Sequence, residues 1–248
     1  MSAVGFPFIA IPGSVVKSSK LTAGVPTGYW RAPGDNGNVW ATQCFVDELA
    51  HAAGKNPLAY TLDLLAAVPA AAGGRFDAAK MTAVLKLATE KAKWGEPRVR
   101  GEGQGFAITY SNNAYVAIVA DVAVSRAGDL KIKKLTAAVD AGTIINLSGA
   151  EAQIQGAMLD GISAAWFQKI TIARGAAAQT NFNQYQLMRM NQSPPVVDVH
   201  FVKSSAPPTG MGEPGLPAAA PAVCNAIFAA TGKRIRTLPF AGESLKWS

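Results

Sequence analysis

Three consecutive apolar runs constrain the fold of this chain of 248 residues most strongly. They cover residues 106–110, 114–124 and 130–139, and each has the length and composition of a β-strand. The segment Arg-Ala-Gly-Asp at residues 126–129 separates the last two runs and is typical of a hairpin turn. The sequence therefore predicts neighbouring strands that pair in antiparallel fashion.

Apolar residues at spacings of three and four predict helices before these strands. The helices are expected over residues 39–53, 56–65 and 77–93. Gly54 is a stop signal for the first helix, while Asn56 can cap the second and Pro57 suits its first turn.

Further elements are expected at the two ends of the chain. These are an extended apolar strand over residues 6–16, a helix over 150–165, strands near Ile170 and over 197–202, and a final helix over 216–231. Antiparallel strand pairs mixed with packed helices favour an α+β (mixed α/β) fold over a doubly wound sheet.

The glycine-rich segment Gly-Glu-Gly-Gln-Gly at residues 101–105 tests this choice. A dinucleotide-binding glycine motif follows a strand and opens a helix, whereas this segment precedes a strand. It is therefore expected to form a turn into the strand.

Composition excludes several classes of function. With 49% hydrophobic and 16% charged residues the chain is expected to be globular. Its net charge of +7 is modest, and its basic clusters lack interleaved aromatic residues, which favours a solvated face or an anionic cofactor over nucleic acid.

Cys44 and Cys224 are expected to be buried free thiols, although one disulfide remains open, and two histidines do not suggest a metal site. No apolar run is long enough to span a membrane, and the start lacks a signal-peptide pattern.

The segment Gly-Met-Gly-Glu-Pro-Gly at residues 210–215 carries the most chemical information. Glu213 lies between glycines before an alanine-rich helix, where small neighbours let a bulky group approach the carboxylate. The helix dipole would favour its ionised form and burial would oppose it, so Glu213 is a candidate general base. The alternative is a residue that caps the first turn of the helix.

This segment resembles the carboxy-terminal signature of the xanthine oxidase family of molybdenum hydroxylases. The similarity continues through Pro-Ala-Ala-Ala-Pro-Ala at 217–222 and residues 225–236, and is greatest to the beta subunit of isoquinoline 1-oxidoreductase and to related bacterial aldehyde dehydrogenases. Residues 28–34, 138–146 and 152–157 resemble, in the same order, family segments that approach the molybdenum centre or line the pterin.

The resemblance implies site residues for which the sequence also allows simpler roles. It implies a catalytic Glu213, a substrate pocket wall at Trp30, no direct metal ligand, and cofactor contacts by Arg31, Ala32, Ser111, Asn112, Gln153, Gly156, Gly212 and Gly215. In the simpler alternatives, Arg31 pairs with Asp35 or Asp47, Asp140 caps a turn, and Gln153 is a surface amide.

Two departures from the family pattern limit the assignment. Asp160 stands where relatives usually have glutamine, so no cofactor contact is assigned to it. The family also has a Gly-Gln-Gly segment near the dithiolene, and residues 103–105 are a poor substitute because they occur at another place in the order and open no helix.

The resemblance further implies a molybdopterin-binding domain of the xanthine oxidase/aldehyde oxidoreductase type. Residues 1–38 would supply an incoming strand and the arginine-containing cofactor loop, 39–97 a helical segment, and 98–248 the carboxy-terminal molybdopterin-binding domain. The implied reaction hydroxylates an aldehyde or an N-heterocyclic carbon with oxygen from water.

The implied cofactor is molybdopterin cytosine dinucleotide with molybdenum, and electrons would leave through iron–sulfur clusters on a partner. Expected partners are the amino-terminal half of the molybdenum subunit, a small iron–sulfur subunit and, for a periplasmic enzyme, a cytochrome c subunit; neither nucleic acid nor direct membrane insertion is expected. The compartment stays open between cytoplasm and periplasm. The alternatives are a non-catalytic cofactor-holding or assembly half and a free-standing basic binding module.

Overall fold

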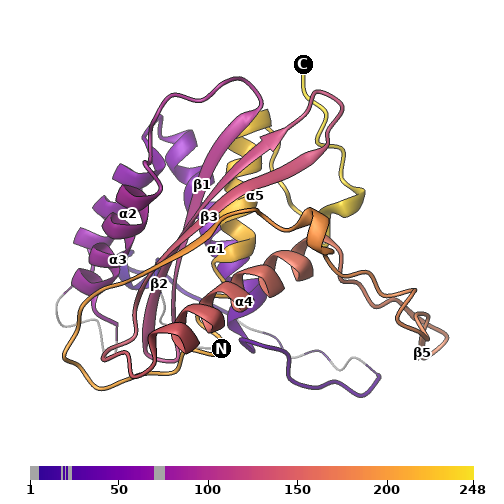
Figure 1. The fold of residues 1–248 in the computed structure, drawn as a ribbon, viewed down its shortest axis with the longest axis horizontal. Coiled ribbons are helices and arrows are strands. Elements are labelled where there is room, and N and C mark those ends of the chain that lie inside the picture. Colours follow the sequence, from indigo (N-terminus) through magenta and orange to yellow (C-terminus); the bar gives the residue numbers. More distant parts are fainter. Residues whose placement is uncertain (1–5, 18, 20, 22–23, 70–75) are drawn as a thin grey trace.

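A computed structural model describes residues 6–17, 19, 21, 24–69 and 76–248. Its centre is a four-stranded sheet in the order β1-β2-β3-β6, with helices on both faces (Figure 1). The strands are β1 (Glu102–Ser111), β2 (Ala114–Val124), β3 (Leu130–Asp140) and β6 (Val197–Phe201). The first three are antiparallel neighbours, and β6 joins β3 in parallel. This mixed sheet with packed helices confirms the expected α+β (mixed α/β) class.

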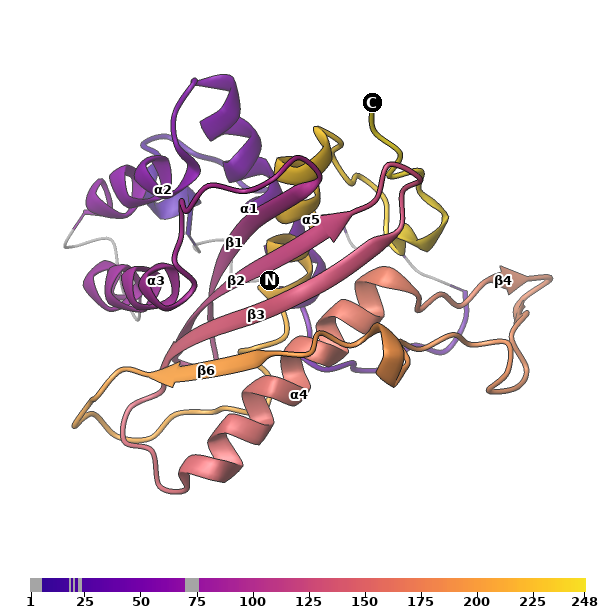
Figure 2. The same ribbon diagram turned by 45° about the horizontal axis from the view of Figure 1, so that its top comes forward.

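The helices agree closely with the periodicity of the sequence. They are α1 (Asp35–Ala52), α2 (Pro57–Ala66), α3 (Ala78–Lys91), α4 (Leu147–Trp166) and α5 (Ala219–Thr231). The side chain of Asn56 accepts hydrogen bonds from the backbone of Leu58 and Ala59, so the predicted cap of α2 is confirmed. A short pair, β4 (Ile172–Ala173) and β5 (Ala176–Ala177), lies on a segment that extends away from the main body in both ribbon views (Figures 1 and 2).

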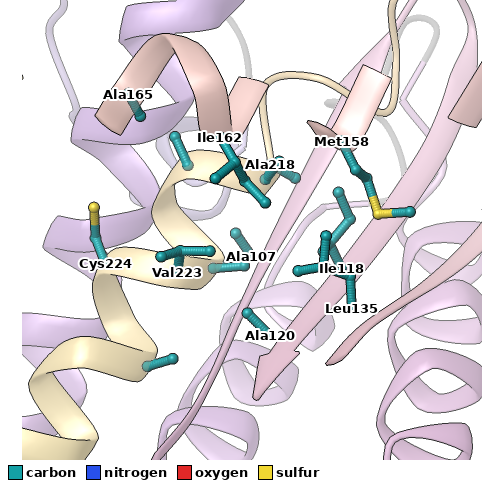
Figure 3. Packing of buried hydrophobic residues seen from close by; sticks show 14 of the residues in the cluster. Ala107, Ile118, Ala120, Leu135, Met158, Ile162, Ala165, Ala218, Val223 and Cys224 are labelled. Carbon is teal, nitrogen blue, oxygen red and sulfur yellow. The ribbon is translucent and has the colours of Figure 1, made fainter. Parts of the chain in front are cut away.

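The central strand β2 is buried on both faces, which explains its uninterrupted apolar sequence. Val116, Ile118 and Ala120 belong to the core between the sheet and helices α4 and α5. Ala117 and Val119 belong to a second core on the side of α3. Figure 3 shows the first core, in which side chains of α4 and α5 lie against those of the sheet.

Helix α5 lies so close to β1 that only glycine fits between them. A Cβ atom on Gly105 would lie 2.1 Å from the backbone nitrogen of Ala226, and one on Gly103 would lie 2.4 Å from the carbonyl oxygen of the same residue. Both glycines lie within β1, so the expected turn at residues 101–105 is wrong beyond its first residue. Gly101, with φ of 86°, makes the turn, and the strand begins at Glu102.

Four further expectations are corrected. The apolar piece at residues 6–16 is not a strand but contains the 3-10 turn η1 (Phe8–Ala10), because proline has a fixed φ and no N–H for a sheet ladder. Two helices begin earlier than expected: α1 at Asp35, and α4 at Leu147 after Asn146, whose side chain accepts from the backbone of Gly149. The final helix begins later, at Ala219.

Cys44 of α1 and Cys224 of α5 are both buried and free, as expected. A hydrogen bond with Cys224, together with burial, raises the pKa of the Cys44 thiol, so Cys44 stays neutral. The basic clusters are partly neutralised by ion pairs, for example Lys134 with Asp198 and Arg234 with Asp47. In the part of the chain that the structure describes, no helix has the length and apolar character needed to cross a membrane.

Candidate functional site

Glu213 lies in the loop between β6 and α5, next to the hairpin that joins β1 and β2. Its side chain is half-buried, and Oε2 accepts a hydrogen bond of 2.7 Å from Nδ2 of Asn112. Asn112 and Asn113 have φ values of 50° and 63°, as the two central residues of a type I′ hairpin turn require. This turn therefore presents an amide donor to the carboxylate.

Glu213 does not cap α5, so the capping alternative is wrong. The helix begins at Ala219, has no acidic residue in its first turn, and is capped by no side chain. Instead, the backbone carbonyl of Glu213 accepts a hydrogen bond of 2.9 Å from the N–H of Leu216. The expectation that the dipole of α5 acts on a first-turn glutamate is corrected for the same reason.

The glycines around Glu213 have different surroundings. A Cβ atom on Gly215 would lie 3.2 Å from the Cβ of Ala157, so this glycine allows close packing on α4. A Cβ atom on Gly210 would lie 3.0 Å from the Cβ of Asn112. By contrast, no atom of the described residues lies within 4 Å of the corresponding position on Gly212. The loop is therefore open beside Gly212, directly before the candidate base.

Arg31 links this loop to α4. Its Nε donates to the carbonyl oxygen of Gly212 at 2.6 Å, and Nη2 donates to the side-chain oxygen of Gln153 at 3.1 Å. Nη1 contacts a carboxylate oxygen of Asp160 at 3.5 Å. The simpler alternative for Arg31 is therefore wrong, because Arg31 pairs with neither Asp35 nor Asp47. Gln153 is exposed on α4, as its simpler role as a surface amide predicts, and its side chain also accepts from Arg31.

Ala32 packs the loop at residues 28–34 against α4, and Ser111 at the end of β1 binds the start of α1. Ala32 is buried with Ala157 and Leu216 and has a φ of 58°, which is unusual for a residue other than glycine. Ser111 is buried, and its hydroxyl donates to the carboxylate of Asp35 at 2.6 Å. The side chains of Ala32 and Ser111 are thus engaged in protein contacts, and their predicted cofactor contacts stay predictions.

The loop before Glu213 is fixed to the end of β3. The N–H of Thr143 donates to the carbonyl of Ala206 at 2.9 Å, and that of Thr209 donates to the carbonyl of Ala141 at 3.0 Å. Asp140 accepts from the N–H of Gly142 at 3.1 Å, as its simpler role as a turn cap predicts.

The structure thus brings together five of the residues expected from the sequence: Glu213, Gly212, Asn112, Arg31 and Gln153. Trp30 precedes Arg31 and is half exposed. Gly156 is exposed on α4 with open space around it, and no hydrogen bond among the described residues joins it to Glu213. Within the described ranges, no three His, Cys, Asp or Glu side chains gather in a way that could hold a metal ion.

Sequence reasoning missed the contacts of Asp35 and Asp160. Asp160 follows Gln153 by seven positions, or two turns of α4, so the two share one helix face. That spacing could have indicated a common partner. No comparable signal exists for Asp35 and Ser111, which are 76 positions apart.

A hollow of about 620 Å³ lies elsewhere, at the other end of β1 and α5. It is lined by Arg100, Ala230, Thr231, Lys233, Lys246, Trp247 and Ser248. None of the residues expected in the site lines it, and it contains no candidate base. The hydrogen-bonded cluster around Glu213 is therefore the better candidate for a catalytic site.

Comparison with known proteins gives a consistent result. The family model described as "molybdopterin cofactor-binding domain" matches residues 41–194, more than half of the chain. A membrane-bound aldehyde dehydrogenase (pyrroloquinoline-quinone) of Gluconacetobacter polyoxogenes is 35% identical over 86% of this chain and 29% of that protein. Subunit beta of isoquinoline 1-oxidoreductase of Brevundimonas diminuta is 29% identical over 81% of this chain and 25% of its own length. The chain thus spans less than a third of these two relatives.

The fold also has a counterpart among solved structures. The aldehyde oxidoreductase from Desulfovibrio gigas superposes with a TM-score of 0.67, covering 88% of this chain and 42% of that chain. The sequence identity is 15%, so this likeness concerns the fold alone.

Proposed function

We propose that this chain helps to hydroxylate an aldehyde or an N-heterocyclic carbon. The premise is that it belongs to the molybdopterin cofactor-binding domain family and to the molybdenum-binding subunits of the xanthine oxidase family. In this proposal Glu213 is the base that takes a proton from the water that supplies the oxygen. The observation that carries the proposal is the hydrogen bond of 2.7 Å from Asn112 to Glu213, beside the open position at Gly212.

The contacts of Glu213 suit proton transfer. Asn112 engages Oε2, and among the described residues no hydrogen bond to Oε1 is present, so that oxygen is left to accept a proton. The backbone on both sides of Glu213 is held, by Arg31 at Gly212 and by the N–H of Leu216 at the carbonyl of Glu213. A carboxylate that is oriented before the reaction loses less entropy when it accepts the proton.

The residues present fit a molybdopterin cofactor. Gly212 and Gly156 are open positions at which a bulky group can approach the backbone, and Asn112 and Gln153 offer neutral polar side chains. We propose that Arg31, Ala32, Ser111, Asn112, Gln153, Gly156, Gly212 and Gly215 surround the cofactor, with Trp30 beside the substrate. When bound, the cofactor would accept the two electrons that the substrate carbon loses.

Other polypeptide segments complete the site in this proposal. Since the chain spans 29% and 25% of two relatives, the remaining part of a molybdenum subunit would supply the missing Gly-Gln-Gly segment and much of the pocket. We further propose the cytosine dinucleotide form of the cofactor, a small iron–sulfur subunit as electron acceptor and, for a periplasmic enzyme, a cytochrome c subunit. The isolated chain would be inactive.

The test is Glu213→Gln in the assembled enzyme, which keeps the shape of the side chain and removes its basicity. Turnover of aldehydes and N-heterocycles should fall by about a thousandfold while molybdenum and pterin stay bound. Glu243→Gln is the matched control and should keep full turnover, because Glu243 is exposed and its side chain forms no hydrogen bond or ion pair among the described residues. Retained turnover in Glu213→Gln would overturn the assignment. A non-catalytic assembly half predicts that neither variant changes the activity of the complex.

A further inference from the structure

We propose that Asp160 is a positioning residue, which holds the guanidinium of Arg31 so that Arg31 fixes the peptide bond preceding Glu213. This inference rests on the proposed function, because it gives the contact a purpose in orienting the base. The resemblance to the family assigned no cofactor contact to Asp160. Its side chain is about one-third exposed and faces that of Arg31 at 3.5 Å.

The contact between Arg31 and Gly212 acts directly on the backbone of the candidate base. The carbonyl oxygen of Gly212, which accepts from Nε at 2.6 Å, belongs to the peptide unit that contains the nitrogen of Glu213. This unit is planar, so fixing the carbonyl oxygen also fixes the direction in which the chain enters Glu213. Asn112 fixes the other end of the same residue, at the carboxylate.

The remaining donors of Arg31 are all directed at α4. Nη2 donates to the side-chain oxygen of Gln153 at 3.1 Å and to its carbonyl oxygen at 3.4 Å, while Nη1 faces Asp160. Among these acceptors of Arg31, Asp160 alone is charged. Arginine has a long side chain with many rotamers, and a charged acceptor restricts them more than neutral acceptors do.

Helix α4 gives Asp160 a fixed position. The opposite face of the helix is buried in the core through Ile154, Met158 and Ile162. Figure 3 shows Met158 and Ile162 among the core side chains. Next to Asp160, a Cβ atom on Gly161 would lie 2.6 Å from the carbonyl oxygen of Leu216. The helix therefore packs directly on the loop that contains Glu213, at Leu216. Helix α4 thus fixes the position of Asp160 and also contacts the segment of the candidate base.

The first test measures hydrogen exchange in the full chain, independently of any activity. Asp160→Asn should raise the exchange rate of backbone amides in residues 206–216 by about threefold or more. Asp198→Asn is a matched control, because Asp198 and Lys134 form a pair of similar exposure at 2.7 Å on β6 and β3. The control should leave residues 206–216 unchanged. Equal exchange in wild type and Asp160→Asn would overturn the proposal.

The second test separates kcat from KM in the assembled enzyme. Asp160→Asn should lower kcat about fivefold with KM unchanged, and Asp160→Glu should restore part of the loss, because the base is displaced while the pocket remains. In an Arg31→Lys background, Asp160→Asn should have little further effect, because Asp160 acts through the guanidinium. Additive losses, or a rise in KM with kcat unchanged, would contradict a positioning role.

The two readouts separate failure of this inference from failure of the proposed function. If Glu213→Gln abolishes turnover but Asp160→Asn changes neither exchange nor kcat, the proposed function stands and the positioning role is wrong. If Asp160→Asn raises exchange in residues 206–216 while Glu213→Gln keeps full turnover, the contact orders the loop but Glu213 is not the base.

Discussion

Two Gly-X-Gly segments of this chain differ in the space around their second glycine, which is tightly packed in one segment and open in the other. In the segment at residues 103–105, a Cβ atom on Gly105 would lie 2.1 Å from the backbone of α5. In the segment at residues 210–212, no atom from the part of the chain that the structure describes lies within 4 Å of the same position on Gly212. The first segment uses glycine to bring a helix onto a strand. The second leaves an open position next to Glu213, where something outside the chain can approach.

The two regions are also held together differently. The interface between β1 and α5, called the seam below, contains small apolar side chains of α5, such as Ala222 and Ala226. The backbones of the two elements are also in contact there. The Glu213 loop is held by polar contacts from the β1–β2 hairpin and from Arg31. Changes in the seam should therefore act on stability, and changes in the loop on function.

The largest effect is expected in the seam, from Gly105→Ala. The new methyl group would overlap backbone atoms of Ala222 and Ala226, which cannot move aside as a side chain can, so the free energy of unfolding should fall by about 3 kcal/mol or more. Chemical denaturation measures this. Gly156→Ala, in the middle of α4 with open space around it, is the control and should stabilise slightly. A loss under about 1 kcal/mol in Gly105→Ala would show that the seam is looser than described.

The next effect is expected in the loop, from Asn112→Gly. Glycine accepts the positive φ of this turn, so the fold should be unaffected, but the amide donor to Glu213 is lost and turnover of the assembled enzyme should fall about tenfold. Asn113→Gly makes the same change at the adjacent residue and should keep normal turnover. Equal losses in both variants would indicate that the turn matters as a whole and that the contact with Glu213 does not.

A smaller effect concerns a charge beside the seam. Burial raises the pKa of Asp47 above its ordinary value, although Arg234 opposes the shift. Since the folded state then holds the proton more tightly, the free energy of unfolding should fall as pH rises from about 3.9 to the raised pKa. Asp47→Asn should remove this contribution, which denaturation at several pH values can measure. An unchanged pH dependence in Asp47→Asn would contradict the assignment.

The smallest effect on stability is expected from Gly212→Ala. The methyl group would enter open space, so the free energy of unfolding should change by less than about 0.5 kcal/mol. Under the proposed function, the same variant should reduce molybdenum and pterin content in the assembled enzyme. A loss of stability similar to that of Gly105→Ala would remove the contrast between the two segments.

The sequence predicted elements whose signals are local. Asn56 and Pro57 located the start of α2, and the apolar run at 114–124 matched β2 residue for residue. The start of α1 was missed because residues 31–37 are rich in turn formers, although Asp35 already begins the helix. Local sequence could not show that Ser111 holds Asp35, since that contact depends on tertiary structure.

The same limit applies to the site. Glu213 and Arg31 were found from their motifs, and the structure brings their segments together through Gly212. The sequence offered Asp35 and Asp47 as simpler partners for Arg31 and did not indicate Asp160, because the position of α4 depends on the tertiary structure. The Gly-Gln-Gly segment at 103–105 was set aside as a poor substitute for the family segment, and in the structure both of its glycines pack against α5.

The central claim is that this chain supplies the base and part of the wall of a molybdopterin site that another segment completes. The most direct measurement is the content of molybdenum, pterin and pyrroloquinoline quinone in the chain, purified alone and with the remaining part of a molybdenum subunit. The account predicts about one molybdenum and one pterin per complex, and neither in the isolated chain. A complex without molybdenum and pterin, or one that contains the quinone instead, would contradict it.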